Sequence, residues 1–329
     1  INYDAVIKQI ENLRKIEFDL LICDESSFLK NRKTLRAKAI LGSFRERRKF
    51  PGIQTDDVIF LTGTPVLNRP TEAFYLLSFL SKERFTNFFH FTQKYGGWKG
   101  DPPRHLDDLH DRTKDLIIRR RKTDVLKELP PKSRSHTYIE LPAAEQANYH
   151  KHLFDMFSKW QTAGRPSIAE MPSLQKYLAQ HKLPRAWEMI DELMEAGRTV
   201  LLFSCYLDPL KATMKHYGPK AALLTGEMSL PDRQVTIDKI QNGEALLGCI
   251  SLKAGGMGIN LTKADTVIFL DCDWVPATHM QAEDRAHRLG QANPVQVFYM
   301  VVADTVDEDM IAILSEKQKI IDQIVDGEV

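Results

Sequence analysis

Two short stretches of the 329-residue sequence carry side chains suited to phosphate chemistry. In the first, Asp24 and Glu25 come directly after the apolar run "DLLIC". An aspartate in this place could hold Mg²⁺, and the neighbouring glutamate could orient or deprotonate a water molecule. The alternative is a polar loop whose acid caps the following helix. These residues alone support both interpretations equally.

The second stretch, "QAEDRAHRLGQ" at residues 281–291, places Gln281, Arg285 and Arg288 at spacings of four and three. On a helix all three would share one face and could meet one negative charge. Taken alone, however, two arginines and a glutamine one turn apart more often form a solvated helix face. Their role therefore depends on the elements around them.

Short apolar runs recur in both halves of the chain and do not alternate with polar residues. They are residues 19–23, 58–61, 200–203, 221–224, 246–250, 267–270 and 295–301. Such runs are typical of strands buried on both faces of a parallel sheet that helices cover. Helical patterns separate them, as in residues 184–197 and 230–243, each ending at a glycine suited to a C-terminal cap. The pattern predicts an α/β fold built from β-α-β units.

The strand pattern nearly disappears between Thr71 and about Leu183, where helical and aromatic patterns replace it. Within this region, the prolines of "LPPK" end a helix through "DVLKE" and start an extended segment, "SRSHTYIEL". We therefore predict four parts. They are a first sheet-containing part at residues 1–70, a helical region and linker at 71–183, a second sheet-containing part at 184–305 and a C-terminal helix at 306–329.

The carboxyl edge of an open α/β sheet is where ligands bind, and Asp24 and Glu25 are predicted to lie at such an edge. The next strand ends in "LTGTP", so Thr62 and Thr64 would lie beside Asp24 if the two strands are neighbours. Hydroxyls in this place could pass a hydrogen-bond signal between a nucleotide and a ligand across a cleft. Turns of this composition are also common without any function.

Composition narrows the class of protein. With 43% hydrophobic and 27% charged residues, the chain is globular and long enough for two domains. We expect neither secretion nor a membrane partner, because no charged-then-apolar leader is visible and no apolar run reaches the roughly 18 residues of a spanning helix. The four cysteines stand singly, which favours reduced thiols in the cytoplasm or nucleus. Net charge is only +1, but residues 30–49 hold nine Lys or Arg against one Glu, which suits either phosphate binding or a solvated surface.

Eight segments occur in an order that resembles the Swi/Snf family of superfamily-two helicase-like ATPases, from its second motif to its sixth. They are "DLLICDESSFLKN", "LTGTPVLNRPTEAFYLL", "IIRRRKTDVLKELPPK", "VLLFSCY", "LLTGEMSLPDRQ", "SLKAGGMGINLTKAD", "DCDWVPATHMQAEDRAHRLGQ" and "VFYMVVADTVDEDM". The resemblance covers nearly the whole chain. It implies two RecA-like lobes, the first incomplete, that close on ATP and Mg²⁺. It also implies double-stranded DNA in a groove across both lobes, with hydrolysis driving translocation.

The resemblance assigns roles to the residues of the two opening stretches. Asp24 matches the magnesium aspartate and Glu25 the acid that activates the attacking water. Arg285 and Arg288 match the arginines that the second lobe offers to the γ-phosphate of ATP, and Gln281 helps orient the phosphate or the water. Placing these arginines on a separate lobe makes hydrolysis depend on closure.

Contacts with the nucleotide and DNA are implied in the same way. Gly256 and Gly258 match positions that lie against the nucleotide, where glycine allows close backbone approach. Candidate contacts to DNA phosphates, which fix register without reading sequence, are Lys30, Asn31, Ser204, Thr225, Ser251 and Lys253. Trp274 matches a position near the DNA strand, although a lone tryptophan beside a strand is as often part of the core.

Two departures from the family pattern matter. Ser27 stands where the family usually has a histidine, so we expect an altered link from this loop to the opposite lobe. No G-x-x-x-x-G-K-[ST] loop occurs in the sequence, so the cradle for the β- and γ-phosphates is missing. Because the family places that loop upstream of "DLLICDE", we expect this chain to be a C-terminal portion of a longer ATPase and to hydrolyse little ATP by itself.

Three functions remain open. The first is a monomeric double-strand DNA translocase that remodels protein-DNA complexes or anneals strands, with DNA-bound proteins as partners. The second is a DNA-binding or regulatory module that has lost its nucleotide loop, although the set of Asp24, Glu25, Arg285 and Arg288 argues against it. The third is a strand-separating helicase of the same superfamily. In all three, the second lobe should contain about five or six parallel strands.

Overall fold

The apolar runs of the sequence form the strands of two parallel sheets, which belong to separate compact units. The computed structural model describes residues 1–43, 50–63, 68–98, 101–163, 171–252 and 258–327. Unit 1 consists of residues 1–120 and 316–329, and unit 2 consists of residues 121–315. The chain therefore passes between the units twice, the second time within its C-terminal helix.

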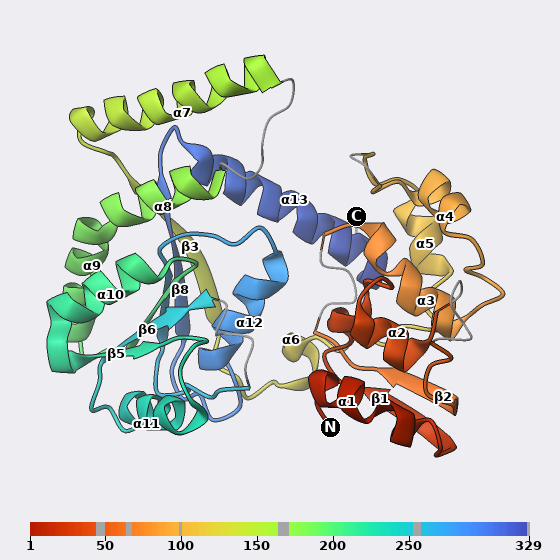
Figure 1. Ribbon diagram of the computed structural model, residues 1–329. Helices are drawn as coiled ribbons and strands as arrows, with labels where there is room; N and C mark the ends of the chain where they lie inside the picture. The colour runs from red at the N-terminus through yellow and green to blue at the C-terminus, as the bar shows by residue number, and fades with distance from the viewer. Residues whose placement is uncertain (44–49, 64–67, 99–100, 164–170, 253–257, 328–329) are drawn as a thin grey trace. The chain divides into compact units, whose positions relative to one another are not determined.

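Figure 1 labels most of the elements along the chain. The strands are β1 (Phe18–Cys23), β2 (Thr55–Phe60), β3 (Lys132–Ile139), β4 (Val200–Ser204), β5 (Ala221–Leu224), β6 (Leu247–Ser251), β7 (Thr266–Phe269) and β8 (Val295–Val302). The helices of unit 1 are α1 (Tyr3–Leu13), the 3-10 helix η1 (Ser26–Leu29), α2 (Leu35–Leu41), α3 (Phe74–Leu80), α4 (Phe88–Tyr95) and α5 (Leu106–Asp111). Those that follow are α6 (Lys122–Val125), α7 (Ala143–Ala163), α8 (Met171–His181), α9 (Leu183–Glu195), α10 (Leu207–Tyr217), α11 (Leu230–Gln241), α12 (Pro276–Ala286) and α13 (Val306–Asp326).

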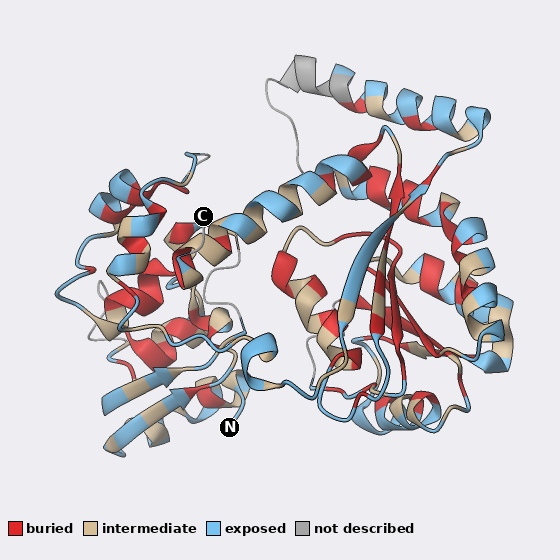
Figure 2. Ribbon diagram, turned by 180° about the vertical axis from the view of Figure 1, so that it is seen from behind, coloured by how far each residue is buried: buried red, intermediate tan, exposed pale blue. Residues whose placement is uncertain are grey.

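Unit 2 is built around a six-stranded sheet with the order β3-β8-β7-β4-β6-β5. Every neighbouring pair in it is parallel. The α/β class and the expected five or six parallel strands are therefore confirmed. Figure 2 shows the strands of this sheet largely buried, apart from β3 at its edge.

Successive side chains of β4 point to opposite faces of this sheet, as the period of a strand requires. Leu201 and Phe203 lie in one core cluster, which includes residues of α11, α12 and α13. Val200 and Leu202 lie in a second cluster, which includes residues of α7, α8, α9 and α10. Both faces are covered, and each fully buried side chain of this size stabilises the fold by about 1.5–3 kcal/mol.

Two helices of unit 2 end as their sequence patterns predict. Gly197 follows α9 with a φ of 77°, and its N–H donates to the carbonyl of Met194 over 3.0 Å. Gly243 follows α11 with a φ of 76°. At the other end of α11, Ser229 accepts a hydrogen bond from the N–H of Asp232 and so caps the first turn.

The segment around "LPPK" differs from the prediction. The helix expected through "DVLKE" is only the single turn α6, which ends at Val125. The extended segment after the prolines is β3, which pairs in parallel with β8 over its whole length. Local patterns did not show that this segment joins a sheet, because its partner strand lies more than 150 residues later in the chain.

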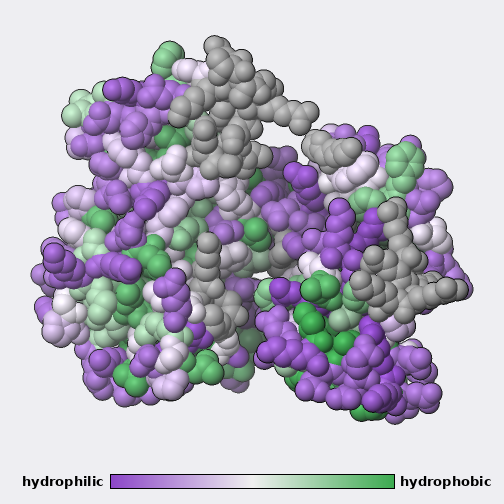
Figure 3. Space-filling model, in the orientation of Figure 1, coloured by the Kyte–Doolittle hydropathy of each residue, from purple (hydrophilic) through white to green (hydrophobic). Residues whose placement is uncertain are grey.

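Unit 1 contains a two-stranded parallel sheet, β1 beside β2. The expectation that these strands are buried on both faces is wrong. Leu20, Ile22 and Ile59 are 44%, 57% and 44% exposed. One face packs on α1, α2 and α3, but among the described residues nothing covers the other. Figure 3 shows further hydrophobic atoms grouped near α1 and α2 on one side of this unit.

The remaining helices of unit 1 enclose an aromatic core to which the end of α13 belongs. Residues of α3, α4 and α5 form this cluster together with Ile321, Ile324 and Val325 of α13. The division into compact units therefore differs from the four parts expected from the sequence, since residues 71–120 pack with residues 1–70. None of the described helices is both long and apolar enough to cross a bilayer.

Candidate functional site

Asp24 and Glu25 follow β1 directly and lie at the carboxyl edge of the sheet, as predicted. Glu25 adopts the left-handed conformation, with φ 48° and ψ 47°, and its N–H donates to Oδ1 of Asp24 over 2.9 Å. The hydroxyl of Tyr3 in α1 donates to the carbonyl of Asp24. Burial raises the pKa of Tyr3 to about 12, so this hydroxyl keeps its proton at neutral pH. The two acids are thus held on a constrained turn.

The turn after β2 is tied to the same place. The N–H of Leu61 donates to the carbonyl of Cys23 over 2.9 Å, and the N–H of Ser26 donates to the carbonyl of Leu61 over 2.9 Å. Thr62 therefore lies next to the acidic loop, because the two strands are neighbours as the prediction required. Thr64 lies outside the described residues.

The acidic loop fits a magnesium ion that is shared with phosphates. Asp24 is exposed, and of its two carboxylate oxygens only Oδ1 has a hydrogen-bond partner among the described residues. No group of three or more potential metal ligands occurs among the described residues. Mg²⁺ commonly binds proteins through one or two carboxylates and takes its other ligands from water and substrate phosphates. Asp24 supplies a hard oxygen donor of this kind.

The stretch of residues 281–291 does not form one continuous helix. Gln281 and Arg285 lie one turn apart on α12, but the helix ends at Ala286, so Arg288 lies beyond it. The carbonyls that would continue the helix have other partners. The carbonyl of Arg285 accepts from the N–H of Leu261 over 2.9 Å, and that of Ala286 accepts from Nε2 of Gln291 over 3.1 Å. The expectation that all three side chains share one helix face is therefore wrong for Arg288.

The chain that follows β6 contacts Arg285. Nη1 of Arg285 donates to the carbonyl of Ile259 over 3.4 Å, so Gly258 lies one residue from this contact. Gly256 and Lys253 lie outside the described residues. Arg288 is exposed. Two of the residues predicted to meet the nucleotide, Gly258 and Arg285, are thus brought together within unit 2.

Four of the predicted DNA contacts lie at the carboxyl edge of the six-stranded sheet. They are Ser204, Thr225, Ser251 and Trp274, at or after the ends of β4, β5, β6 and β7. The three hydroxyl residues are buried. Ser204 donates its hydroxyl to the carboxylate of Asp271, and Trp274 packs against the core. The edge is the one where ligands bind in α/β sheets, but this geometry commits Ser204 to an internal bond.

Comparison with known families decides the identity of the chain. A family model described as the SNF2-related domain matches residues 1–186, and the helicase conserved C-terminal domain matches residues 185–290. The chain belongs to the SNF2 family. This membership confirms the resemblance drawn from the eight motifs.

Relatives of this SNF2-family chain include bacterial and human proteins. An uncharacterized ATP-dependent helicase of Mycoplasma pneumoniae is 30% identical over 345 residues, which cover 98% of this chain and 32% of the relative. The DNA annealing helicase and endonuclease ZRANB3 of Homo sapiens is 28% identical over 342 residues, covering 97% and 31%. The chain thus spans about a third of the length of the curated relatives it matches. The solved Sulfolobus solfataricus SWI2/SNF2 ATPase core in complex with dsDNA is 24% identical, covers 99% of this chain and 72% of that one, and has a TM-score of 0.49.

In unit 1 of this SNF2-family chain, Lys30 and Asn31 are engaged in local bonds. Nζ of Lys30 lies 3.2 Å from Oε2 of Glu72, in a half-buried ion pair. Oδ1 of Asn31 accepts a hydrogen bond from the N–H of Lys33 over 3.0 Å. Asn31 is exposed, whereas Lys30 would have to exchange Glu72 for a phosphate. Both residues remain predicted DNA contacts.

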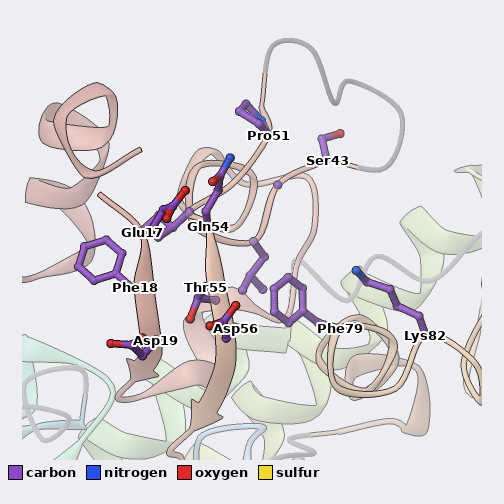
Figure 4. A pocket seen from close by; sticks show the side chains of 13 residues that line it. Glu17, Phe18, Asp19, Ser43, Pro51, Gln54, Thr55, Asp56, Phe79 and Lys82 are labelled. Atoms are coloured by element: carbon purple, nitrogen blue, oxygen red, sulfur yellow. The ribbon is translucent and has the colours of Figure 1, made fainter. Parts of the chain in front are cut away.

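A pocket of about 720 Å³ in unit 1 lies away from these residues. Figure 4 shows Glu17, Phe18, Gln54 and Thr55 at the start of β1 and β2, which is the amino edge of the sheet. Asp24 lies at the opposite edge. This pocket is therefore not where the acidic loop lies, and we assign it no role in phosphate chemistry.

Sequence reasoning missed several buried charges of the SNF2-family chain. Glu283, two residues before Arg285, is fully buried and ion-paired with Lys132 and Arg134. Lys182 is buried as well, beside Asp307. Their partners lie more than 100 residues away in the chain. No local pattern marks such residues, since a charge in a helix is ordinarily a solvated one.

Proposed function

We propose that this chain is the part of a DNA-dependent ATPase that activates the attacking water and supplies arginines to the transferring phosphate. The acidic loop supports this best. Asp24 and Glu25 are held by backbone bonds at the carboxyl edge of a parallel strand, with one carboxylate exposed. The same chain carries Arg285 and Arg288, and a module that only binds DNA has no use for this whole set.

The proposed chemistry assigns one task to each residue. Mg²⁺-ATP supplies a phosphoryl group whose negative charge spreads over its oxygens in the transition state. Asp24 would hold the metal, and Glu25 would orient a water molecule and accept its proton. Arg285 and Arg288 would neutralise charge on the transferring group. The hydroxyl of Thr62, beside the acidic loop, would pass a hydrogen-bond signal between the nucleotide and a ligand across the cleft.

We infer that the loop cradling the β- and γ-phosphates comes from residues other than these 329. No G-x-x-x-x-G-K-[ST] sequence occurs in the chain. The relatives are about three times as long as the matched part. The exposed apolar side chains of β1 and β2 are also what a larger sheet-containing lobe would bury. The active enzyme in this proposal is the full-length protein.

Double-stranded DNA is the proposed substrate, along which the protein would translocate. The human relative is a DNA annealing helicase by name, and phosphate contacts from Lys30, Asn31 and Thr225 would suit binding without sequence readout. We propose that the protein works as a monomer in the cytoplasm or nucleus, with DNA-bound proteins as partners. Its four cysteines are free thiols, which suits a reducing compartment.

The test is ATP hydrolysis by the full-length protein with and without duplex DNA. Duplex DNA should stimulate hydrolysis, and Arg288→Ala should lower the stimulated kcat by about 10³-fold. The matched control is Arg185→Ala, because the ion pair of Arg185 with Glu188 on α9 is exposed. The isolated 329-residue chain should hydrolyse little ATP. Full activity of Arg288→Ala would refute the role given to this arginine.

A second candidate is a DNA-binding or regulatory module, which the missing phosphate loop favours. Duplex binding by the full-length protein without hydrolysis under any nucleic acid would establish this candidate instead. Displacement of one strand of a duplex during hydrolysis would point to a strand-separating helicase. Hydrolysis that moves the protein along an intact duplex supports the translocase.

A further inference from the structure

Two stretches of unit 2 that are distant in sequence are joined by a dense set of polar contacts. One is residues 283–288, which carry Arg285 and Arg288 and are named here the finger segment. The other is residues 122–134, from α6 into β3, named here the linker clamp. Both belong to unit 2, and Arg120, the last residue of unit 1 before the linker clamp, stands two positions ahead of Lys122.

Glu283 is the buried anchor of this contact. Its Oε1 accepts from Nε of Arg134 over 2.8 Å and from the hydroxyl of Tyr299 over 3.0 Å. Its Oε2 accepts from Nζ of Lys132 and from Nη2 of Arg134, both over 2.7 Å. All four lone-pair positions of the carboxylate are therefore used. Burial alone would raise the pKa of Glu283, but the bond from Arg134 and the charge of Lys132 hold it below its usual value.

Lys122 and His287 close the other end of the contact. Nζ of Lys122 donates to the carbonyl of His287 over 3.0 Å and lies 2.7 Å from Oδ1 of Asp284. Nε2 of His287 lies 2.8 Å from the carbonyl of Pro130, and a carbonyl only accepts, so Nε2 carries the hydrogen. Contacts before and after Arg285 thus tie its backbone to the linker clamp, and the tie at His287 directly precedes Arg288.

The chain between the two units is short at this point. Within unit 1, Arg119 is bound to Asp322 and Asp326 of α13, at 3.3 and 2.5 Å. Only two residues separate Arg119 from Lys122, and three peptide steps span at most about 11 Å. Lys122, which is anchored to the finger segment in unit 2, therefore follows closely on a residue that is anchored in unit 1. A displacement of unit 1 would be transmitted along the chain to this anchor.

We propose that the linker clamp positions Arg285 and Arg288 for the γ-phosphate, and that Lys122 makes this positioning depend on the connection to unit 1. The proposal rests on the proposed function, since it presumes that these arginines act on the phosphate. Lys122, Lys132 and Arg134 are positioning residues in it and do not touch the nucleotide. Closure of the units would then bring the two arginines near the γ-phosphate and would also position their backbone.

The experiment compares variants of the full-length protein at saturating duplex DNA. Lys122→Ala should lower kcat for ATP by about 10- to 100-fold, as expected for a misplaced catalytic group, with KM for ATP little changed. Lys122→Arg, which keeps a donor, should recover most of this loss. Lys127→Ala is the matched control, because Lys127 is an exposed lysine of the same segment that makes no hydrogen bond or ion pair with the finger segment among the described residues. Lys122→Ala should lower kcat by a smaller factor in the Arg288→Ala variant than in the wild type, because both substitutions affect the same step.

A structural readout on the 329-residue chain separates this proposal from the proposed function. Amide hydrogen exchange should quicken at residues 283–288 in Lys122→Ala and stay unchanged there in Lys127→Ala. If Arg288→Ala is fully active, the proposed function fails. The contact between the linker clamp and the finger segment is then tested by hydrogen exchange alone. If Arg288→Ala is inactive while Lys122→Ala matches the wild type in kcat or in hydrogen exchange, the positioning role proposed for the linker clamp is refuted. Lys122 is over a third exposed, so its variants should fold even if Glu283→Gln does not.

Discussion

Nζ of Lys182 lies 2.5 Å from Oδ2 of Asp307, and both side chains are buried in unit 2. The same ammonium donates to the carbonyls of Leu270 and Met300, over 2.8 and 2.9 Å. This ion pair joins the start of α9 to the ends of β7 and β8 and to the start of α13. It therefore fixes the helix through which the chain returns to unit 1.

Breaking this ion pair should destabilise unit 2 strongly. Asp307→Asn keeps an acceptor for the N–H of Val302, which bonds Oδ2 over 3.0 Å, but removes the carboxylate charge paired with the buried ammonium. We expect a loss of about 3–5 kcal/mol in the free energy of unfolding, measured by urea denaturation. Lys182→Met combined with Asp307→Asn should lose less than the sum of the single changes. Strict additivity would contradict a direct pair.

Asp271 should make stability depend on pH. Burial raises the pKa of Asp271, although bonds from Ser204 and Cys205 and the charge of Lys182 oppose this shift. The folded state thus holds the proton more tightly than the unfolded chain does. The stabilising contribution is complete below about pH 4 and is lost as pH rises through the raised folded pKa.

The variant Asp271→Asn should lack this loss. Its urea midpoint relative to the wild type should rise as the pH increases above about 4, because the folded wild type then loses the proton that stabilises it. The exposed Asp238→Asn on α11 serves as the reference for removing one carboxylate. A difference between Asp271→Asn and wild type that is the same at every pH would show that Asp271 titrates normally.

The conformation of Glu25 predicts a conflict between stability and activity. At φ 48° a side chain with a Cβ is strained by about 1–2 kcal/mol, whereas glycine is not. Glu25→Gly should therefore be about 1 kcal/mol more stable than Glu25→Ala in thermal or urea unfolding. Both variants should lose DNA-stimulated ATP hydrolysis in the full-length protein. Equal stability of the two would mean that the turn relaxes when the glutamate is removed.

The ion pair of Lys30 with Glu72 should compete with DNA. Lys30→Ala should weaken duplex binding and lower the slope of log affinity against log salt by about 1, as loss of one phosphate contact requires. Glu72→Gln keeps one of the two acceptor oxygens that Asn68 uses and removes the competing charge, so it should strengthen DNA binding at low salt. Fluorescence anisotropy with a duplex measures both. An unchanged salt slope in Lys30→Ala would remove this residue from the DNA contacts.

Much of the fold followed from local patterns. The runs at β4 to β8 were recognisable because unbroken stretches of Val, Ile and Leu are typical of strands in a sheet that helices cover on both faces. The same pattern identified β1 and β2 as strands, although one face of their sheet is exposed. The glycines after α9 and α11 marked the helix ends for a similar local reason. The lengths of α6 and α12 were not recognisable, since partners elsewhere in the chain determine where each helix ends.

The sequence by itself determined the fold class and the order of the motifs, and it predicted Asp24, Glu25, Arg285 and Arg288 as the candidates for phosphate chemistry. Tertiary structure alone decided what holds them. Glu283 meets Lys132 across 151 positions of sequence, and β3 meets β8 at the edge of the sheet. A buried charge is tolerable only when the fold brings it a partner, and which partner arrives depends on the packing of the whole unit.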